Sequence, residues 1–440
     1  MLAAGRFWSS GSWWIDMVIT RENKDGIVTK EHATEAIQEF LAQHNYTGMR
    51  LLLIIPDNTR SGPVGDIFKI MFDCLADRVE CLDILVALGT HQPLSEKHIC
   101  QRLSISVEER QTKYRKVQFF NHEWDRPETY TTIGRISADE IDELSDGLFR
   151  EEVQISINKL IYNYDEFFIL GPVFPHEVVG ISGGHKYIFP GIAGEEIIHF
   201  FHWLGAVVTN PAICGTTWTP PRKVVEKAAS FITVPRKLFA LVAVEDKLKG
   251  LYIGDVIETW ETAARLSQQV HIVYKDKPYH TILGLAPEMY DDIWTAGKVM
   301  YKLEPIVADG GTLIIYAPHI TEVSYTHGHY LDQIGYHTRD YFLKRMDMFK
   351  GVPRGIIAHS THVKGIGTFI DGVEKPRVNV VLATGISKER CDKINLGYMD
   401  PDEINIAEYE NREDQGVLLV HHAGEMLHRL ADGTIPRITE

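Results

Sequence analysis

Gly171 to His202 is the segment of this chain in which residues capable of chemistry are most concentrated. It reads GPVFPHEVVGISGGHKYIFPGIAGEEIIHFFH, and its candidate functional side chains are His176, Lys186, His199 and His202. Imidazole serves as a general base or a metal ligand, and a lysine amine binds anions or forms a covalent bond when neutral. Gly183 and Gly184 permit positive φ and let backbone approach a ligand closely. The segment predicts a ligand site, although an ordinary loop with solvated or satisfied polar groups remains an alternative.

Three shorter loops carry further polar groups. PDNTR follows the apolar run RLLLII, and its candidate ligand-binding residues are Asp57, Asn58, Thr59 and Arg60. The guanidinium of Arg60 suits bidentate binding of a carboxylate or phosphate. ALGTH follows a second apolar run, where Gly89, Thr90 and the next helix N-terminus form a natural anion site. NHEWD adds His122 as a candidate acid or base. Each loop alone is equally well explained as a helix cap or an inert turn.

The elements that must position these loops follow an α/β pattern. Apolar runs at 50–56, 81–88, 166–171, 240–245 and 269–274 predict strands, and the amphipathic stretches 30–44, 64–75, 192–202 and 255–268 predict helices. On 192–202, His199 and His202 lie about one turn apart, so either is a candidate metal ligand. Alternating helices and strands imply a mostly parallel sheet, which binds ligands at its strand C-termini.

We expect two α/β domains with mostly parallel sheets and an active site in the cleft between them. The first, cofactor-binding, is expected at 1–275, with 1–25 disordered or preceding a native start for which Met17 is a candidate. The second is expected at 280–410, with helices at 290–302 and 331–349 and strands at 312–317 and 378–383. The segment 411–440 is expected to pack back on the first domain.

Composition excludes several classes of protein. A formal net charge of -15 argues against a nucleic-acid surface, which needs clustered Lys and Arg. The five cysteines, Cys74, Cys81, Cys100, Cys214 and Cys391, form no CxxC pair, so we expect no disulfide framework and a cytoplasmic setting. No window approaches the roughly 18 apolar residues of a membrane span, and no signal peptide is expected.

Taken together, PDNTR, ALGTHQPLS, NHEWD and the spacing H(x9)K(x15)H of His176, Lys186 and His202 resemble the lactate racemase family, in the family's order along residues 50 to about 320. The resemblance implies an isomerase that racemises or epimerises 2-hydroxy acids. It also implies a nickel-pincer nucleotide, the nickel complex of pyridinium-3,5-bisthiocarboxylic acid mononucleotide, made by upstream cofactor-synthesis enzymes. Nucleic acid and membrane are not expected partners.

The resemblance also implies roles for individual residues. By position, His202 would bind nickel, and Lys186 would form the covalent link to the cofactor. Cofactor contacts would come from Asp57, Asn58, Thr59, Arg60, Gly89, Thr90, Gly183 and Gly184, with Arg60 also close to the substrate carboxylate. His122 and His176 match two bases that remove the hydroxyl proton from opposite faces while a hydride leaves C2 for the cofactor.

One family pattern, Tyr-Gln-x-x-Lys, is altered in this chain. Trp294 and Thr295 replace Tyr and Gln, whereas Lys298 keeps the lysine that faces the substrate. A shorter Thr leaves space and changes the hydrogen-bonding set, so we expect a substrate larger or more polar than lactate, such as a sugar acid. Four histidines of this half, His327, His329, His359 and His362, are either substrate-binding or surface residues, and like His199 they carry no assigned role.

Three other functions are alternatives to this one. A nicotinamide-dependent 2-hydroxyacid dehydrogenase fits the α/β pattern, but no GxGxxG opens a βαβ unit with an acidic residue about 20 positions on. A zinc hydrolase lacks an HExxH motif. A non-catalytic protein that binds hydroxy acids would need no paired bases.

Overall fold

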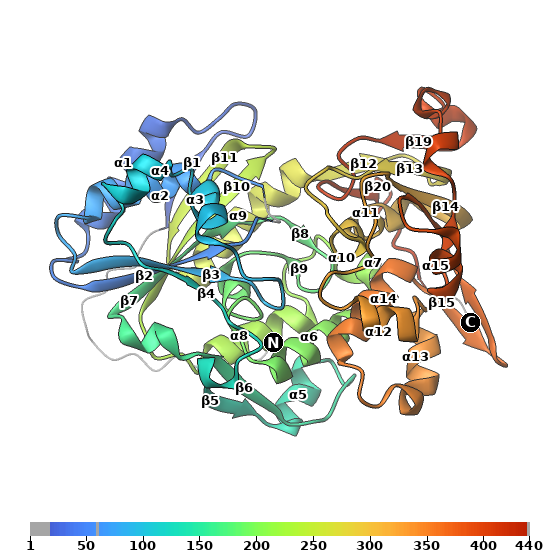
Figure 1. The fold of residues 1–440 in the computed structure, drawn as a ribbon, viewed down its shortest axis with the longest axis horizontal. Coiled ribbons are helices and arrows are strands. Elements are labelled where there is room, and N and C mark those ends of the chain that lie inside the picture. The colour runs from blue at the N-terminus through green and yellow to red at the C-terminus, as the bar shows by residue number, and fades with distance from the viewer. Residues whose placement is uncertain (1–17, 59–60, 438–440) are drawn as a thin grey trace, which may run out of the picture.

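The apolar run RLLLIIP forms strand β2 (Arg50–Pro56), which is buried after Arg50. Its side chains alternate between two cores, because Leu51, Leu53 and Ile55 contact one cluster whereas Leu52 and Ile54 contact another. A strand with apolar residues on both faces requires cover on both sides. The structure, a computed structural model, describes residues 18–58 and 61–437, and it covers β2 with helices on each face (Figure 1).

The larger sheet has the strand order β1-β11-β10-β7-β2-β3-β4. Besides β2, its strands are β1 (Ile19–Glu22), β3 (Cys81–Ala87), β4 (Phe119–Asn121), β7 (Glu166–Pro172), β10 (Arg236–Val244) and β11 (Lys247–Gly254). Neighbouring strands from β10 to β4 run parallel. At the other edge, β11 pairs antiparallel with β10, and β1 pairs antiparallel with β11. The predicted α/β class with a mostly parallel sheet is confirmed.

Helices pack on both faces of this sheet. One face is covered by α1 (Lys30–Ala42), α2 (Val64–Leu75) and α3 (Glu96–Arg102), and the other by α6 (Glu195–Val208), α8 (Pro220–Ala229) and α9 (Val256–His271). Polar caps set several starts: Thr29 accepts from the backbone N–H of His32 at α1, and Ser95 from His98 at α3. Ser106 forms a capping box at α4 (Val107–Gln111), as Ser137 does at α5 (Ala138–Leu144).

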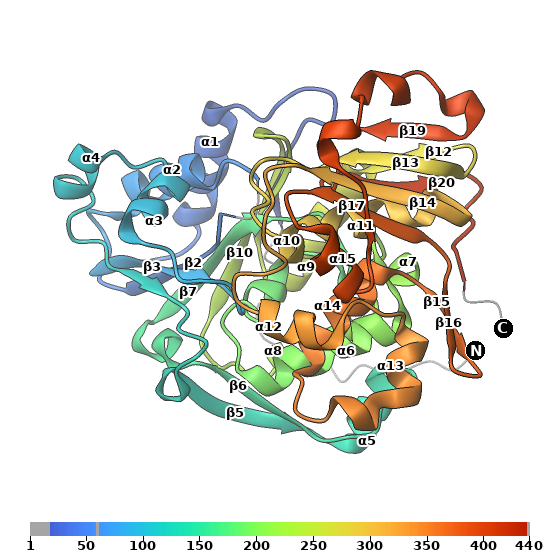
Figure 2. The same cartoon turned by 45° about the vertical axis from the view of Figure 1, so that its right-hand side comes forward.

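A second sheet, with the order β18-β17-β14-β13-β19, is parallel throughout. Its strands are β13 (Tyr279–Leu285), β14 (Val307–Ala317), β17 (Asn379–Thr384), β18 (Gly397–Tyr398) and β19 (Val417–Val420). The helices of this half are α10 (Ile293–Ala296), α11 (Lys298–Leu303), α12 (Gly328–Ile334), α13 (Arg339–Arg345), α14 (Arg354–Lys364) and α15 (Lys388–Lys393). Figure 2 shows this sheet beside the first one, with α14 lying against α6.

Short paired strands complete the described chain. They are the hairpin β5 (Tyr130–Ile136) and β6 (Val153–Asn158), the pairs β8 (Pro175–His176) with β9 (Gly180–Ile181) and β15 (Gly367–Ile370) with β16 (Val373–Pro376), and β12 (Ile272–Lys275) with β20 (Leu427–Leu430). In the part of the chain that the structure describes, we find no helix with the length and apolar character needed to cross a bilayer.

Helix α6 belongs to both hydrophobic cores. Its residues Ile197, Phe200 and Leu204 pack under the larger sheet, and Trp203 and Ala206 pack with the second half of the chain. A helix that is apolar almost all round is buried rather than amphipathic. His199 and His202 are therefore carried by a helix that is held between two packed cores.

Several expected boundaries differ from the structure. Residues 19–22 form β1 at the sheet edge, although 1–25 were expected to be disordered or to precede the native start; Met17 lies outside the described residues. The predicted strand at 269–274 begins at Ile272 and pairs with β20 instead of joining the larger sheet. The strand β11 was missed. Residues 417–420, expected in a segment that packs on the first domain, extend the second sheet as β19.

Two predicted helices are interrupted. The stretch 290–302 divides into α10 and α11 around Gly297. The stretch 331–349 breaks after α12 at Gly335, whose φ of 69° is left-handed, before α13 begins. Glycine accepts this conformation without steric cost, so it ends the helix.

Candidate active site

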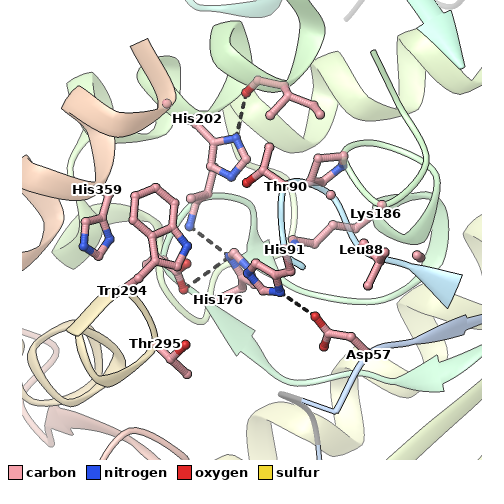
Figure 3. Close-up of a pocket in the computed structure, with 18 of the residues that line it drawn as sticks. Asp57, Leu88, Thr90, His91, His176, Lys186, His202, Trp294, Thr295 and His359 are labelled. Carbon is pink, nitrogen blue, oxygen red and sulfur yellow. Dashed lines mark hydrogen bonds and ion pairs between the residues drawn. The ribbon is translucent and has the colours of Figure 1, made fainter. Parts of the chain in front are cut away.

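A pocket lies at the C-terminal ends of β2 and β3, where a parallel sheet presents ligand sites (Figure 3). Pairing of Pro56 with Ala87 brings Asp57 beside the loop at 88–91. The pocket lining comes from five stretches of the chain, and includes Asp57, Gly89, Thr90, His91, His176, Glu177, Lys186, His202, Trp294, Thr295, Lys298, Tyr301, His359 and His362. Residues from both halves of the chain therefore face one cavity.

Asp57 orients His91 in this pocket. The Asp57 carboxylate accepts a short hydrogen bond from Nδ1 of His91 (Figure 3). The loop is fixed from two sides: the Gly89 N–H donates to Gly191 O at 3.0 Å, and Trp124 Nε1 donates to His91 O at 3.0 Å. With its proton on Nδ1, a neutral His91 ring carries its lone pair on Nε2. His91 is thus arranged as a proton acceptor.

His176 has the opposite arrangement. Its Nδ1 accepts a hydrogen bond from the backbone N–H of Val178 at 3.1 Å, so the neutral ring carries its proton on Nε2. Glu177 Oε2 lies 3.4 Å from the same Nδ1. Burial opposes ionisation of Glu177, yet Lys302 and His362 hold the pKa of this carboxyl below its usual value. An ionised carboxylate therefore stands beside His176.

His202 has the tautomer that a metal ligand requires. Its Nδ1 donates to Ile198 O at 2.7 Å within α6, which leaves the lone pair on Nε2. Burial, with a smaller contribution from Lys186, lowers the pKa of His202 to about 3, so the ring is neutral at physiological pH. Lys186 lines the same pocket from the short 3-10 helix Gly184–Tyr187. The two residues expected to hold the cofactor thus face one cavity.

The opposite wall comes from α10, α11 and α14. Trp294 stacks on His359 with ring centroids 4.1 Å apart and an interplanar angle of 25°. Tyr301 Oη lies 3.0 Å from His359 Nδ1, which fixes the position of that ring. Lys298 Nζ lies 4.8 Å from the ring centroid of Tyr290. Of the residues expected to bind substrate, Trp294, Thr295 and Lys298 line the pocket.

The structure does not bring His122 into this pocket. His122 follows β4 at the same sheet edge, but the side chain is fully buried and is absent from the described pocket lining. Its Nε2 donates to Ala193 O at 3.2 Å, and its Nδ1 accepts from Asn158 Nδ2 at 3.3 Å. Burial lowers the pKa of His122 to about 4. Both ring nitrogens of His122 are thus engaged by protein groups, and its expected role as a base stays a prediction.

Gly183 and Gly184 have structural reasons to be glycine. Both have left-handed φ, 85° and 60°, and a Cβ on Gly183 would lie 2.5 Å from Val173 Cγ2. Buried Arg222 donates to Gly183 O at 3.2 Å, which fixes the loop from the side of α8. Neither glycine is in the described pocket lining, so their expected cofactor contacts stay a prediction.

The PDNTR loop is only partly described. Asn58 lines a neighbouring hollow rather than the pocket around His202. Thr59 and Arg60 lie outside the described residues, so their expected contacts with cofactor and substrate carboxylate stay predictions.

Sequence reasoning overlooked His91, Glu177 and Tyr301 as pocket residues. For His91 a signal was present, because ALGTH ends a strand that neighbours the one before PDNTR, and both ends meet at one edge. For Tyr301 no comparable signal exists, since it reaches the pocket from a helix of the other half.

The donor set fits an ion that brings most of its own ligands. Among the described residues, no group of three or more His, Cys, Asp or Glu side chains is placed to hold a metal. One neutral imidazole, His202, presents its lone pair in the pocket that also contains Lys186. A nickel ion carried by an organic ligand needs only such a single protein donor, so the residues fit the group that the family implies.

The fold and the site together define a protein with a ligand pocket at the carboxyl edge of a parallel sheet. The family model described as lactate racemase N-terminal domain matches residues 22–213. A crystal structure of a protein from Thermotoga maritima is 31% identical, covers 91% of this chain and 98% of its own, and has a TM-score of 0.84. The lactate racemase apoprotein from Thermoanaerobacterium thermosaccharolyticum shares the fold at 17% identity and a TM-score of 0.67, over 96% of this chain and 94% of its own. The comparison with curated proteins finds no match.

The chain belongs to the lactate racemase family. This relationship points to an isomerase of the racemase or epimerase type.

Proposed function

We propose that this protein inverts C2 of a 2-hydroxy acid with a nickel-pincer nucleotide bound at Lys186 and His202. The observation that carries the proposal is the hydrogen bond from His202 Nδ1 to Ile198 O, which leaves the Nε2 lone pair of this pocket residue available. Lys186 and the oriented base His91 line that same pocket. A ligand donor, an anchoring amine and a proton acceptor are thereby combined.

The cofactor would be held by Lys186 as a covalent anchor and by His202 as the protein ligand of nickel. When bound, it supplies a store for the C2 hydride, which explains isomerisation without net redox change. Lys186 needs a neutral amine to form its bond. The enzymes that make this cofactor are the expected upstream partners.

Proton transfer would be divided between two histidines of the pocket. His91, with Asp57 on its Nδ1, takes the hydroxyl proton at Nε2. Asp57 stabilises the imidazolium that results, as the carboxylate does in a catalytic triad. His176, beside the ionised Glu177, holds a proton for return to the substrate oxygen. We therefore propose His91, in place of His122, as the partner of His176.

The substrate would be bound by the wall opposite these histidines. Lys298 provides a positive charge for the substrate carboxylate, a role expected also of Arg60. Thr295 and Trp294 shape the space next to it. Because Trp294 stacks on His359, its ring has a fixed position in the pocket wall. We propose a substrate larger or more polar than lactate.

Co-production with the cofactor-making enzymes tests the proposal. We expect one nickel per chain, a mass increase on a peptide containing Lys186, and racemisation or epimerisation of at least one acid among lactate, malate, aryl lactates and sugar acids. The matched control is Lys223→Ala, which removes a lysine from α8 outside the described pocket lining and should keep the mass increase. Protein that carries nickel and the modification but converts none of these acids contradicts the proposed activity.

A further inference from the structure

A large groove continues from the pocket. It has a volume of about 1000 Å³ and shares Thr90 and Ile198 with the pocket lining. Its walls come from the β5–β6 hairpin, the N-termini of α6 and α14, and the segment leading into α12. Nothing in a three-carbon acid would use this space.

Aromatic rings connect the pocket with the groove. Trp294, which lines the pocket, has its ring centroid 4.6 Å from that of His327, which lines the groove. Trp124 follows at 6.2 Å from His327. Loops from the two halves of the chain are joined here, since Gln92 Nε2 donates to Thr326 Oγ1 at 3.0 Å. The groove therefore has a firm wall of flat, amphipathic rings.

The other groove residues are rich in hydrogen-bonding groups. The hairpin presents Thr132, Gln154 and Ser156 in register, with Thr132 Oγ1 3.1 Å from Ser156 Oγ. Three carboxylates line the groove, those of Asp125, Glu195 and Glu196.

The charge of the groove is negative. Its guanidinium, Arg354, is already paired with Glu151 at 2.5 Å. Burial lowers the pKa of His327 to about 4, with His91 and His199 adding to the shift, so this ring contributes no positive charge near neutral pH. Carboxylates accept hydrogen bonds from hydroxyl groups but repel a second anion.

We propose that the groove binds the far end of the substrate and that this end is an uncharged, polyhydroxylated chain or sugar. The inference rests on the proposed function, which places the reacting carboxyl end at His91 and Lys298. Aromatic rings cover the C–H faces of such a chain while carboxylates and hydroxyls bind its hydroxyl groups. A dicarboxylic acid would meet repulsion, and an alkyl or aryl tail would leave the polar groups of the groove unpaired.

Binding of tail fragments tests the groove without cofactor or turnover. Saturation-transfer NMR on the full chain, prepared without cofactor, would use xylitol, glutarate and benzyl alcohol as probes. We expect signals for xylitol, none for glutarate, and loss of the xylitol signals in the double variant D125N/E195Q. The matched control is Glu35→Gln, an exposed residue of α1, which should keep them. Preferred binding of glutarate or benzyl alcohol, or xylitol binding that survives D125N/E195Q, overturns the proposal.

Turnover separates this inference from the proposed function. With loaded protein, we expect kcat/KM for five- and six-carbon aldonates to exceed that for lactate at least about tenfold, and this ratio to fall in D125N/E195Q. Efficient turnover of lactate with no gain for aldonates upholds the proposed function and overturns the groove. Absence of turnover on every acid contradicts the proposed function, and the NMR result then decides the groove alone.

Discussion

The carboxylate of Asp57 is hydrogen bonded to Nδ1 of His91, and the two residues follow neighbouring parallel strands that end at the same edge of the sheet. The pair resembles the orienting half of a catalytic triad. It gives His91 a fixed tautomer before any substrate binds. Replacing Asp57 therefore tests the orientation of His91, whereas replacing His91 tests the proton acceptor itself.

We predict that His91→Gln lowers kcat by about 10²–10⁴-fold, because the proton acceptor is lost. Asp57→Asn keeps the side-chain shape but offers an amide to Nδ1, so it should also lower kcat by at least about 10²-fold. Steady-state kinetics on protein with measured nickel content would show both effects.

His122→Gln is the matched comparison. Since His122 is buried and bonded to Ala193 O and Asn158, this change should lower thermal stability more than it lowers kcat per folded, loaded molecule. If His122→Gln abolishes turnover while His91→Gln retains it, the assignment of bases is reversed.

We predict that His202→Ala reduces bound nickel at least about tenfold, because the single protein donor is removed. His199→Gln, one turn earlier on α6, should keep the metal. Elemental analysis of the purified proteins measures both. Equal nickel content in the two variants would show that the ligand lies elsewhere.

The buried histidines predict acid sensitivity. Burial lowers the pKa of His122, His271 and His362 to about 4, whereas a histidine in the unfolded chain has a pKa of about 6.5. Between these pH values the unfolded chain binds protons that the folded chain does not. Full stability is therefore present above about pH 6.5 and is lost as pH falls toward 4, by up to about 1.4 kcal/mol per pH unit for each histidine.

Urea unfolding at pH 8, 6 and 5 measures this slope. His271→Gln removes one titrating ring while keeping a donor for Ala243 O, so it should reduce the slope by about one proton. A free energy of unfolding that is constant over this range would contradict the prediction.

Gly183→Ala tests the loop before Lys186. The added Cβ meets a left-handed φ and Val173 Cγ2 at 2.5 Å, so we expect a loss of about 2–4 kcal/mol in the free energy of unfolding. Gly48→Ala is the control, because its φ of 74° is similar but its Cβ would have no neighbour within 4 Å. Equal losses in the two variants would show that only the backbone conformation matters.

The architecture could be predicted from the sequence because several strands of the larger sheet are continuous apolar runs. The run at 50–56 is β2 as predicted, and 64–75 is α2. β11 was missed because its sequence KLKGLYIG mixes charge and glycine with its apolar residues, although most of the strand is buried between β10 and β1.

The site was predicted less completely, for a geometric reason. His91 and His122 both follow strands of the larger sheet, and sequence alone gives no direction for either side chain. The His91 ring is hydrogen bonded to Asp57 in the pocket, whereas the His122 ring is hydrogen bonded to Ala193 O. His176, Lys186 and His202 line one pocket, as expected from the sequence. They lie close in sequence, so short local structure keeps them together.

Because α6 is shared by both cores, the carbonyl of Ile198 and the imidazole of His202 lie on the element that is hardest to displace. Local opening of loops around the cavity leaves this helix in place. Its amide protons should accordingly exchange with solvent only when the whole molecule unfolds, and the position of His202, the proposed metal ligand, should be retained for as long as the protein stays folded.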